Sequence, residues 1–258
     1  MSIATESVPV IAIASAGDGQ LTFPPAMEAR FRPGLAAVYG DLFPREDVIA
    51  LLCFGSALRG ETKPNSDLDL CAFTKGTEYW TRSHMVNGVE VQLQVAPLQY
   101  WRGKIEKGAP FMIQALATGE LLFDRTGEAT ALKRDAEERH RAGPPAPVPE
   151  HIDRAGYIIT NMVRDLEDMS EDSVEARMLA SVVVLEALRF WALTQRCWPT
   201  RKLSVTLGYL QGRDSSLAAK IESFYASFSP AHAIAFVDAV LELVGGRRYE
   251  LSTAPEPI

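Results

Sequence analysis

The stretch that decides the fold of this chain runs from Phe54 to Leu70 and reads FGSALRGETKPNSDLDL. It follows an apolar, β-branched run, residues 48–54, whose length suits a buried strand. Gly55 ends that strand at a turn, because glycine adopts backbone angles that other residues avoid. A turn-rich connection over residues 60–66 leads into an alternating strand over residues 67–73. The stretch therefore predicts two strands joined by a turn and a short loop.

The second strand carries two carboxylates on one face. Because side chains alternate along a strand, Asp67 and Asp69 point one way, and Leu68 and Leu70 point the other. The two acids repel each other, and aspartate is a poor strand former. A solvent-facing edge strand would tolerate them, but a bound cation explains them better. Mg²⁺ suits the pair, since it takes one or two carboxylates and completes its shell with water and substrate phosphates.

Gly55 and Ser56, upstream of the aspartates, form the other half of the motif. Gly55 lets a phosphate approach the backbone closely. If a helical turn begins at Ser56, its free N–H groups point at an anion. A strand followed by Gly-Ser is common as a plain turn, but the aspartate pair downstream favours phosphate binding. The residues thus predict a site for a divalent metal and a nucleoside triphosphate.

A third acid lies in another alternating segment, residues 89–95. Its valines and Leu93 face one way, while Glu90, Gln92 and Gln94 face the other. Among these three, only Glu90 can bind metal as an anion or accept a proton as a general base. An exposed strand face remains the alternative. A shift of one residue in strand pairing would put Gln92 at the site and leave the base missing.

These residues resemble the nucleotidyltransferase superfamily that includes DNA polymerase beta and the aminoglycoside nucleotidyltransferases. Residues 54–70 look like the streptomycin/spectinomycin adenylyltransferase group, and Glu90-Val91-Gln92 is similar to the strand that supplies its third acid. The resemblance implies that Asp67, Asp69 and Glu90 are catalytic and bind Mg²⁺. It also implies that Gly55, Ser56 and Ser66 hold the triphosphate, and that Lys202 reaches it from the C-terminal half.

The implied activity is Mg²⁺-dependent transfer of AMP from ATP to a hydroxyl of a small molecule. An aminoglycoside-like antibiotic is one such acceptor, which would make the protein an antibiotic-resistance enzyme. A tRNA or protein acceptor, as in toxin-type relatives, also fits the motif. A different class of function, a non-catalytic nucleotide-binding or regulatory module, remains open if Gln92 rather than Glu90 faces the metal. The sequence does not specify the acceptor, the nucleotide or the oligomeric state.

Composition limits the partners. The chain has 258 residues, is 47% hydrophobic and carries a net charge of −7. Both halves, divided at residue 150, are negative, whereas proteins that grip nucleic acid through phosphates need basic surface. A hydroxylated, cationic small molecule suits this charge better. The three cysteines and four histidines show no disulfide framework or zinc spacing, so Cys53 and Cys71 are expected to pack in the core.

The predicted fold class is α+β, in two parts. Residues 1–142 are expected to form a catalytic domain, a mixed sheet with flanking helices. Residues 143–149 (GPPAPVP) read as a proline-rich linker. Residues 150–258 read as a helical bundle that binds the acceptor. The N-terminus lacks a signal-peptide pattern and residues 8–16 are too short to span a bilayer, so a cytoplasmic protein is expected.

Several details can be compared with the structure. Strands are expected near residues 8–16, 48–54, 67–74, 89–95 and 120–123, and a helix from Pro25 to Leu42. In the C-terminal half, helices are expected over residues 152–169 and 171–197, the second with a broad buried face that includes Val182 and Leu193. Phe190, Trp191 and Trp198 are expected in the core. Arg247-Arg248 is expected to be a solvated helix exit.

Overall fold

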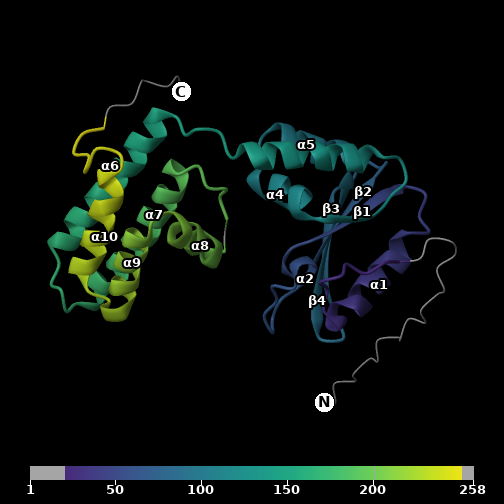
Figure 1. Cartoon of the computed structure of the whole chain (residues 1–258), viewed down its shortest axis with the longest axis horizontal. Coiled ribbons are helices and arrows are strands. Elements are labelled where there is room, and N and C mark those ends of the chain that lie inside the picture. Colours follow the sequence, from purple (N-terminus) through teal and green to yellow (C-terminus); the bar gives the residue numbers. More distant parts are fainter. Residues whose placement is uncertain (1–20, 201, 252–258) are drawn as a thin grey trace, which may run out of the picture. The chain divides into compact units, whose positions relative to one another are not determined.

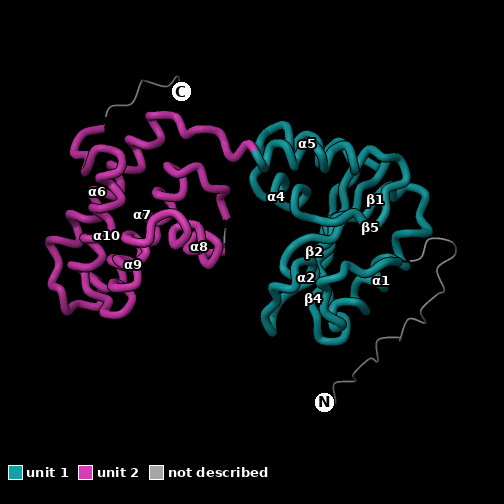
Figure 2. The backbone as a smooth tube through the Cα atoms, in the orientation of Figure 1, with its two compact units in different colours: residues 1–141 teal, residues 142–258 magenta. Residues whose placement is uncertain are grey.

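The computed structural model describes residues 21–200 and 202–251. Two compact units, residues 1–141 and residues 142–258, divide the chain (Figure 2). The strand expected over residues 8–16 lies outside the described residues. None of the helices in the described part combines the length and apolar character that a membrane span requires.

Unit 1 is built on a five-stranded mixed sheet (Figure 1). Its strands are β1 (Val48–Phe54), β2 (Leu68–Thr74), β3 (Trp80–Val86), β4 (Val89–Pro97) and β5 (Glu120–Asp124). Their order across the sheet is β3-β4-β2-β1-β5, and β2 and β4 are the parallel pair. With the helices of both units, this confirms the predicted α+β class.

Helices cover both faces of this sheet. They are the 3₁₀ helix η1 (Ala29–Phe31), α1 (Arg32–Leu42), α2 (Ser56–Arg59), α3 (Leu98–Glu106), α4 (Pro110–Thr118) and α5 (Glu128–Ala142). On one face, α1 packs on a core that includes Leu51, Leu70 and Val91. On the other face, Trp101 of α3 lies against Phe73, with ring centroids 5.7 Å apart. Cys53 and Cys71 are buried and free, as predicted.

Strand β3 was not predicted from the sequence. Its residues, WTRSHMV, are half exposed at the sheet edge and include few apolar positions, so their alternation is weak. A signal was present in the turn that follows. Asn87 and Gly88 both have positive φ, 50° and 81°, and Val86 pairs with Val89 across them. An Asn-Gly pair between two strands is a strong hairpin signal.

The helix expected from Pro25 begins later. Residues 25 and 26 form a turn, η1 begins at Ala29, and α1 begins at Arg32. Pro33 explains the start, because a proline has no backbone N–H and is tolerated in a helix only within the first turn. A helix that started at Pro25 would have Pro33 in its interior.

All the regular secondary structure among the described residues of unit 2 is helical. Its helices are α6 (Pro149–Glu167), α7 (Val174–Thr194), α8 (Leu203–Arg213), α9 (Ser215–Ser227) and α10 (Pro230–Glu242). Their apolar faces meet in one core, which contains Phe190 and Trp191 and confirms the predicted burial of these residues; Trp198 is buried as well. Helix α7 is shorter than expected at both ends, and Ser173 caps its start by accepting a hydrogen bond from the N–H of Ala176 at 3.0 Å.

The buried face of α7 is narrower than predicted. Val182 and Leu193 are 47% and 39% exposed. Helix α7 packs on α6, α8 and α10, so the neighbouring helices leave one stripe of α7 open. An apolar residue on a helix therefore did not imply burial here, since exposed apolar residues are common on folded proteins.

The prediction for Arg247 and Arg248 was wrong. Arg247 donates to both carboxylate oxygens of Asp238, at 2.7 and 2.9 Å, and lies 2.8 Å from Glu167. The hydrogen bonds with Asp238 and Glu167 raise the pKa of Arg247 above the ordinary arginine value. Arg248 donates to Asp153 at 2.8 Å, and its backbone N–H donates to Thr160. The pair ties the segment after α10 to α6 and α10.

Asp124, at the end of β5, caps helix α5. Its carboxylate accepts hydrogen bonds from the N–H groups of Thr126, Gly127 and Thr130 and from the Thr130 hydroxyl. Burial works to raise the pKa of Asp124, but these hydrogen bonds outweigh it and lower the pKa below the ordinary 3.8. A depressed carboxyl pKa adds stability that is present above the unfolded-state pKa and is lost as the pH falls through the folded-state pKa.

We expect Asp124→Ala to lower the free energy of unfolding by about 1 kcal/mol at pH 7, as loss of a helix cap does. Below about pH 4 the difference from the parent protein should shrink, because the parent carboxyl becomes protonated. Urea unfolding at pH 7 and pH 3 measures both. Asp135→Ala, which removes an exposed ion pair with Arg139 on the same helix, is the control. An effect of Asp124→Ala that is equal at both pH values would contradict this account.

Candidate functional site

The turn after β1 brings Gly55 against Asp69 of β2. Gly55 has a φ of 85°, which side-chain-bearing residues rarely adopt. A Cβ atom added to it would lie 2.2 Å from Oδ2 of Asp69, so only glycine leaves room for this carboxylate. Helix α2 begins at the next residue, Ser56, which is buried. The motif is therefore compact: the aspartate and the turn are in direct contact.

The two aspartates lie on the face predicted for them. Asp69 pairs with Phe54 of β1, while Leu68 and Leu70, on the opposite face, are fully buried in the core beneath α1. Asp67 directly precedes β2. The burial of the leucines fixes which way the strand faces, so both carboxylates point away from that core.

Segment 26–30 holds the loop that leads to Asp67. The guanidinium of Arg30 donates to the carbonyl oxygens of Lys63 and Pro64, at 2.6 and 2.7 Å. Glu28 accepts hydrogen bonds from Arg30, at 3.0 Å, and from the hydroxyl of Thr62. Sequence reasoning missed this clamp, since nothing in a local pattern links Arg30 to residues more than thirty positions away.

Ser66, predicted to hold the triphosphate, is part of the same loop. Its hydroxyl accepts a hydrogen bond from the N–H of Lys63 at 2.8 Å, and its own N–H donates to the Lys63 carbonyl at 2.9 Å. This pair of bonds closes the turn directly before Asp67. The Ser66 hydroxyl keeps its proton available for donation to another acceptor.

Gln92 reaches the aspartate pair from β4. In the parallel pairing of β2 and β4, Gln92 lies opposite Asp69, and its side-chain amide donates to Oδ2 of Asp67 at 2.9 Å. The sequence analysis named Gln92 only as an alternative to Glu90. The signal for it lies in the register between two strands, which the alternation of either strand alone does not contain.

Glu90 lies on the same polar face of β4, nearer the hairpin, and is exposed. Its carboxylate accepts a hydrogen bond from the hydroxyl of Ser83 on β3. Within residues 21–200 and 202–251, no three histidine, cysteine, aspartate or glutamate side chains are gathered so that they could hold a metal ion. The roles of Glu90 as metal ligand and base therefore stay predictions.

Lys202 belongs to unit 2, where it is exposed directly before α8. Its backbone N–H donates to the hydroxyl of Thr200 at 3.1 Å. Shortly before it, Arg196 donates to the carbonyl of Pro144 at 3.0 Å, which ties this end of α7 to the start of the unit. The predicted contact between Lys202 and a triphosphate stays a prediction.

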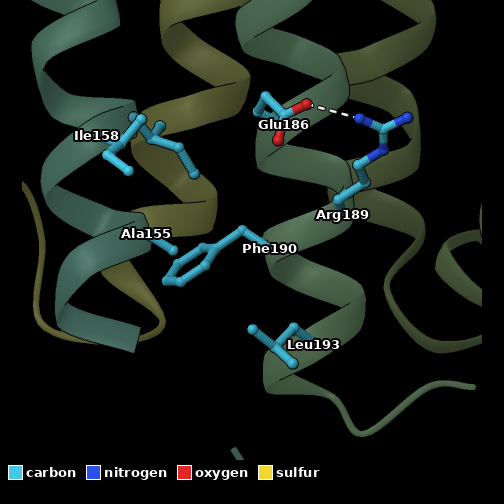
Figure 3. A pocket seen from close by; sticks show the side chains of 7 residues that line it. Ala155, Ile158, Glu186, Arg189, Phe190 and Leu193 are labelled. Carbon is cyan, nitrogen blue, oxygen red and sulfur yellow. Dashed lines mark hydrogen bonds and ion pairs between the residues drawn. The ribbon is translucent and has the colours of Figure 1, made fainter. Parts of the chain in front are cut away.

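A shallow hollow of about 230 Å³ lies between α6 and α7 of unit 2 (Figure 3). Ala155 and Ile158 line it from α6, and Phe190 and Leu193 line it from α7. At its edge, Glu186 accepts a hydrogen bond from Arg189 at 2.6 Å. The lining is thus apolar with a paired acid and base, and the hollow carries no net charge to select a charged ligand.

Cys53 and Cys71 lie beside the motif but are not nucleophiles. Burial, with the nearby charge of Asp69, raises the pKa of Cys53 to about 12 and that of Cys71 well above its ordinary value. A thiol reacts as the thiolate, so both side chains stay unreactive near neutral pH. The chemistry of this face depends on its oxygen and nitrogen groups.

If the chain catalyses the nucleotide transfer predicted from its sequence, we expect Arg30→Ala to lower the turnover number about tenfold, as the loss of residues that orient ligands does. The loop before Asp67 would lose two carbonyl contacts and with them its fixed position. Arg30→Lys should recover little, because an ammonium lacks the planar fork that spans two carbonyls. Steady-state kinetics measures both variants. Arg45→Ala, which removes a remote exposed pair with Asp47, is the control, and an equal effect of the two alanine variants would contradict the clamp.

A model of a known protein family matches part of unit 1. Residues 39–119 match the family model described as a nucleotidyltransferase domain. This range runs from before β1 to the end of α4. It includes every site residue of unit 1 named above except the clamp residues Glu28 and Arg30. A search of curated protein sequences finds no match.

Among solved structures, the chain is similar to a nucleotidyltransferase-like protein from Exiguobacterium sibiricum 255-15, with 13% identity over 83% of this chain and 74% of that one, at a TM-score of 0.46. At this TM-score the likeness carries no argument of its own. The family match covers the Gly55-Ser56 turn, both aspartates and β4. Residues 39–119 of this chain therefore match a nucleotidyltransferase domain, in agreement with the resemblance of the motif to the nucleotidyltransferase superfamily.

Proposed function

We propose that the protein transfers AMP from ATP to a hydroxyl group of a small molecule, with Mg²⁺ as cofactor. The observation that carries the proposal is the seating of the Asp69 carboxylate against Gly55, with Asp67 on the same side of β2. A half-buried glycine turn that a side chain would block, placed beside two acids, suits close approach of a phosphate and its metal.

The donor set fits a magnesium ion. Asp67 and Asp69 supply carboxylate oxygens, and Mg²⁺ needs only one or two of these when water and substrate phosphates complete its shell. When bound, the ion would neutralise charge on the reacting phosphate group. The backbone N–H of Ser56 and the hydroxyl of Ser66 would donate to phosphate oxygens. Lys202 would add a positive charge to the triphosphate.

In the proposed reaction, the oxygen of the acceptor hydroxyl attacks the α-phosphorus of ATP. A bond forms between these two atoms, and the bond to the β-phosphate oxygen breaks, so pyrophosphate leaves. Glu90 takes the proton of the hydroxyl. Its hydrogen bond from Ser83 orients the carboxylate, and a base with exposed surface can meet an incoming acceptor.

We propose a hydroxylated, cationic acceptor, such as an aminoglycoside-like antibiotic, bound with the help of the helical unit, residues 150–258. The net charge of −7 favours the encounter with a cation and disfavours the phosphate backbone of nucleic acid. Such an enzyme would work in the cytoplasm, where ATP and Mg²⁺ are available. A tRNA or protein acceptor is the alternative within the same chemistry.

One observation favours a second candidate, a nucleotide-binding module without catalysis. Gln92, which cannot act as a base, contacts Asp67, whereas Glu90 is bonded to Ser83. A module of this kind would bind Mg-ATP and release no pyrophosphate with any acceptor.

The test is incubation with α-labelled ATP and Mg²⁺ in the presence of an aminoglycoside panel, total tRNA or a protein extract. We expect label on one or more aminoglycosides and equimolar pyrophosphate. Label only on tRNA or protein would replace the acceptor and keep the chemistry. Calorimetric binding of Mg-ATP without pyrophosphate release from any mixture would refute transfer and support the binding module.

A further inference from the structure

We propose that Gln92 is a positioning residue for Asp67, and that the metal site of the nucleotide-free protein is built from two carboxylates and one neutral amide. This inference rests on the proposed function, because it assigns the metal to Asp67 and Asp69. It gives Gln92 a part of its own in the site and places Glu90 outside the metal-binding set.

The sheet register brings Gln92 to this place. Strand β4 lies between β3 and β2, so Gln92 is paired on both sides, with Ser83 and with Asp69. Its amide then reaches the residue two positions before Asp69 and donates to Oδ2 of Asp67, directly before β2, at 2.9 Å. Glu90 is the second residue after the Asn-Gly turn and is exposed, and its carboxylate accepts a hydrogen bond from Ser83 of the outer strand β3.

The amide has a specific physical effect on Asp67. A side-chain N–H that donates to Oδ2 restricts the rotation of the carboxylate, while Oδ1 stays available to a metal. Because the amide is neutral, it adds no repulsion to the two neighbouring acids. A glutamate at the same position would place three negative charges together, an arrangement that needs a cation to be stable.

This arrangement predicts the order of binding. Two carboxylates held by an amide form a weak site for a free divalent ion, because Mg²⁺ gives up its water reluctantly and usually binds through substrate phosphates as well. The nucleotide-free domain would therefore remain largely without metal, and the ion would arrive with the triphosphate. The site would be metal-loaded only when ATP is present.

The test measures Mn²⁺ binding to the full-length, nucleotide-free protein by electron paramagnetic resonance, together with Mg-ATP binding by calorimetry. Four variants are compared: Gln92→Glu, Gln92→Leu, Glu90→Gln and Gln94→Leu. Gln94 is the matched control, since it lies on the same polar face of β4 and pairs with Cys71, two positions beyond the aspartate pair. Circular dichroism establishes that each variant is folded.

We expect Gln92→Glu to tighten Mn²⁺ binding about tenfold or more, because a third carboxylate joins the site. Gln92→Leu should weaken Mg-ATP binding or lower the turnover number about 10- to 100-fold. Glu90→Gln should leave Mn²⁺ affinity within about twofold of the parent protein, since it is outside the set proposed here. Gln94→Leu should change none of these values.

Two results would overturn the inference: a Glu90→Gln variant that loses Mn²⁺ affinity, or a Gln92→Leu variant that behaves like Gln94→Leu. If Gln92→Leu does not fold, the isosteric Gln92→Glu variant still decides the question, and unchanged Mn²⁺ affinity in it would count against the proposal. The metal measurements need no acceptor. If the variants show the expected changes in Mn²⁺ and Mg-ATP affinity but no nucleotide is transferred, the proposed function alone is refuted. If nucleotide is transferred but the Gln92 variants bind Mn²⁺ and Mg-ATP as the parent protein does, this inference alone is refuted.

Discussion

Asp69→Asn is expected to lower the rate of nucleotide transfer by at least about 10²- to 10³-fold while the protein remains folded. The substitution keeps the size and shape of the side chain but removes the charge that would hold the metal and, through it, the phosphate. Loss of a single group that stabilises developing charge in an active site has effects of this size. Asp69 also lies in the middle of the site, between Gly55 and Gln92.

Pyrophosphate release measures this effect, and thermal unfolding by circular dichroism measures the fold. Glu106→Gln, which changes an exposed acid at the end of α3, is the control for the loss of one negative charge. The control should retain full activity. Retained activity in Asp69→Asn, with a normal control, would remove Asp69 from the catalytic site and with it the assignment of the metal.

Gly55→Ala is expected to abolish transfer almost as completely, for a steric reason. The new Cβ would lie 2.2 Å from Oδ2 of Asp69, well inside the distance at which non-bonded atoms repel. Either the carboxylate or the turn must move, and both are part of the proposed phosphate and metal site. A displacement of about 1 Å at a reacting centre can cost about 10²-fold in rate.

Gly108→Ala is the control that separates the steric clash at Asp69 from the effect of backbone strain. Gly108 also has a positive φ, 72°, but nothing lies within 4 Å of the position its Cβ would take. Gly108→Ala should lose about 1–2 kcal/mol of unfolding free energy from the strained backbone. Gly55→Ala should lose more, because its φ of 85° and ψ of −161° lie in a region that is essentially restricted to glycine. Only Gly55→Ala should lose activity beyond that. Equal activity of the two variants would mean that the contact between Gly55 and Asp69 has no role in the reaction.

The amino-acid sequence alone was sufficient to predict the local structure of the site. The apolar run before Gly55 predicted β1, and the alternation of residues 67–70 predicted which way the aspartates face. Both predictions agree with the structure, because burial of Leu68 and Leu70 leaves only one orientation for the strand. The resemblance of residues 54–70 to nucleotidyltransferases agrees with the domain match over residues 39–119.

Contacts between distant segments were decided by the tertiary structure alone. The Arg30 clamp, the bond from Gln92 to Asp67 and the ion pair of Arg247 with Asp238 each depend on how separate elements pack. Alternation states which face of a strand a residue occupies, but not which residue of the next strand lies opposite. That choice depends on pairing along the whole length of both strands, and here it placed an amide, rather than a third acid, beside Asp67.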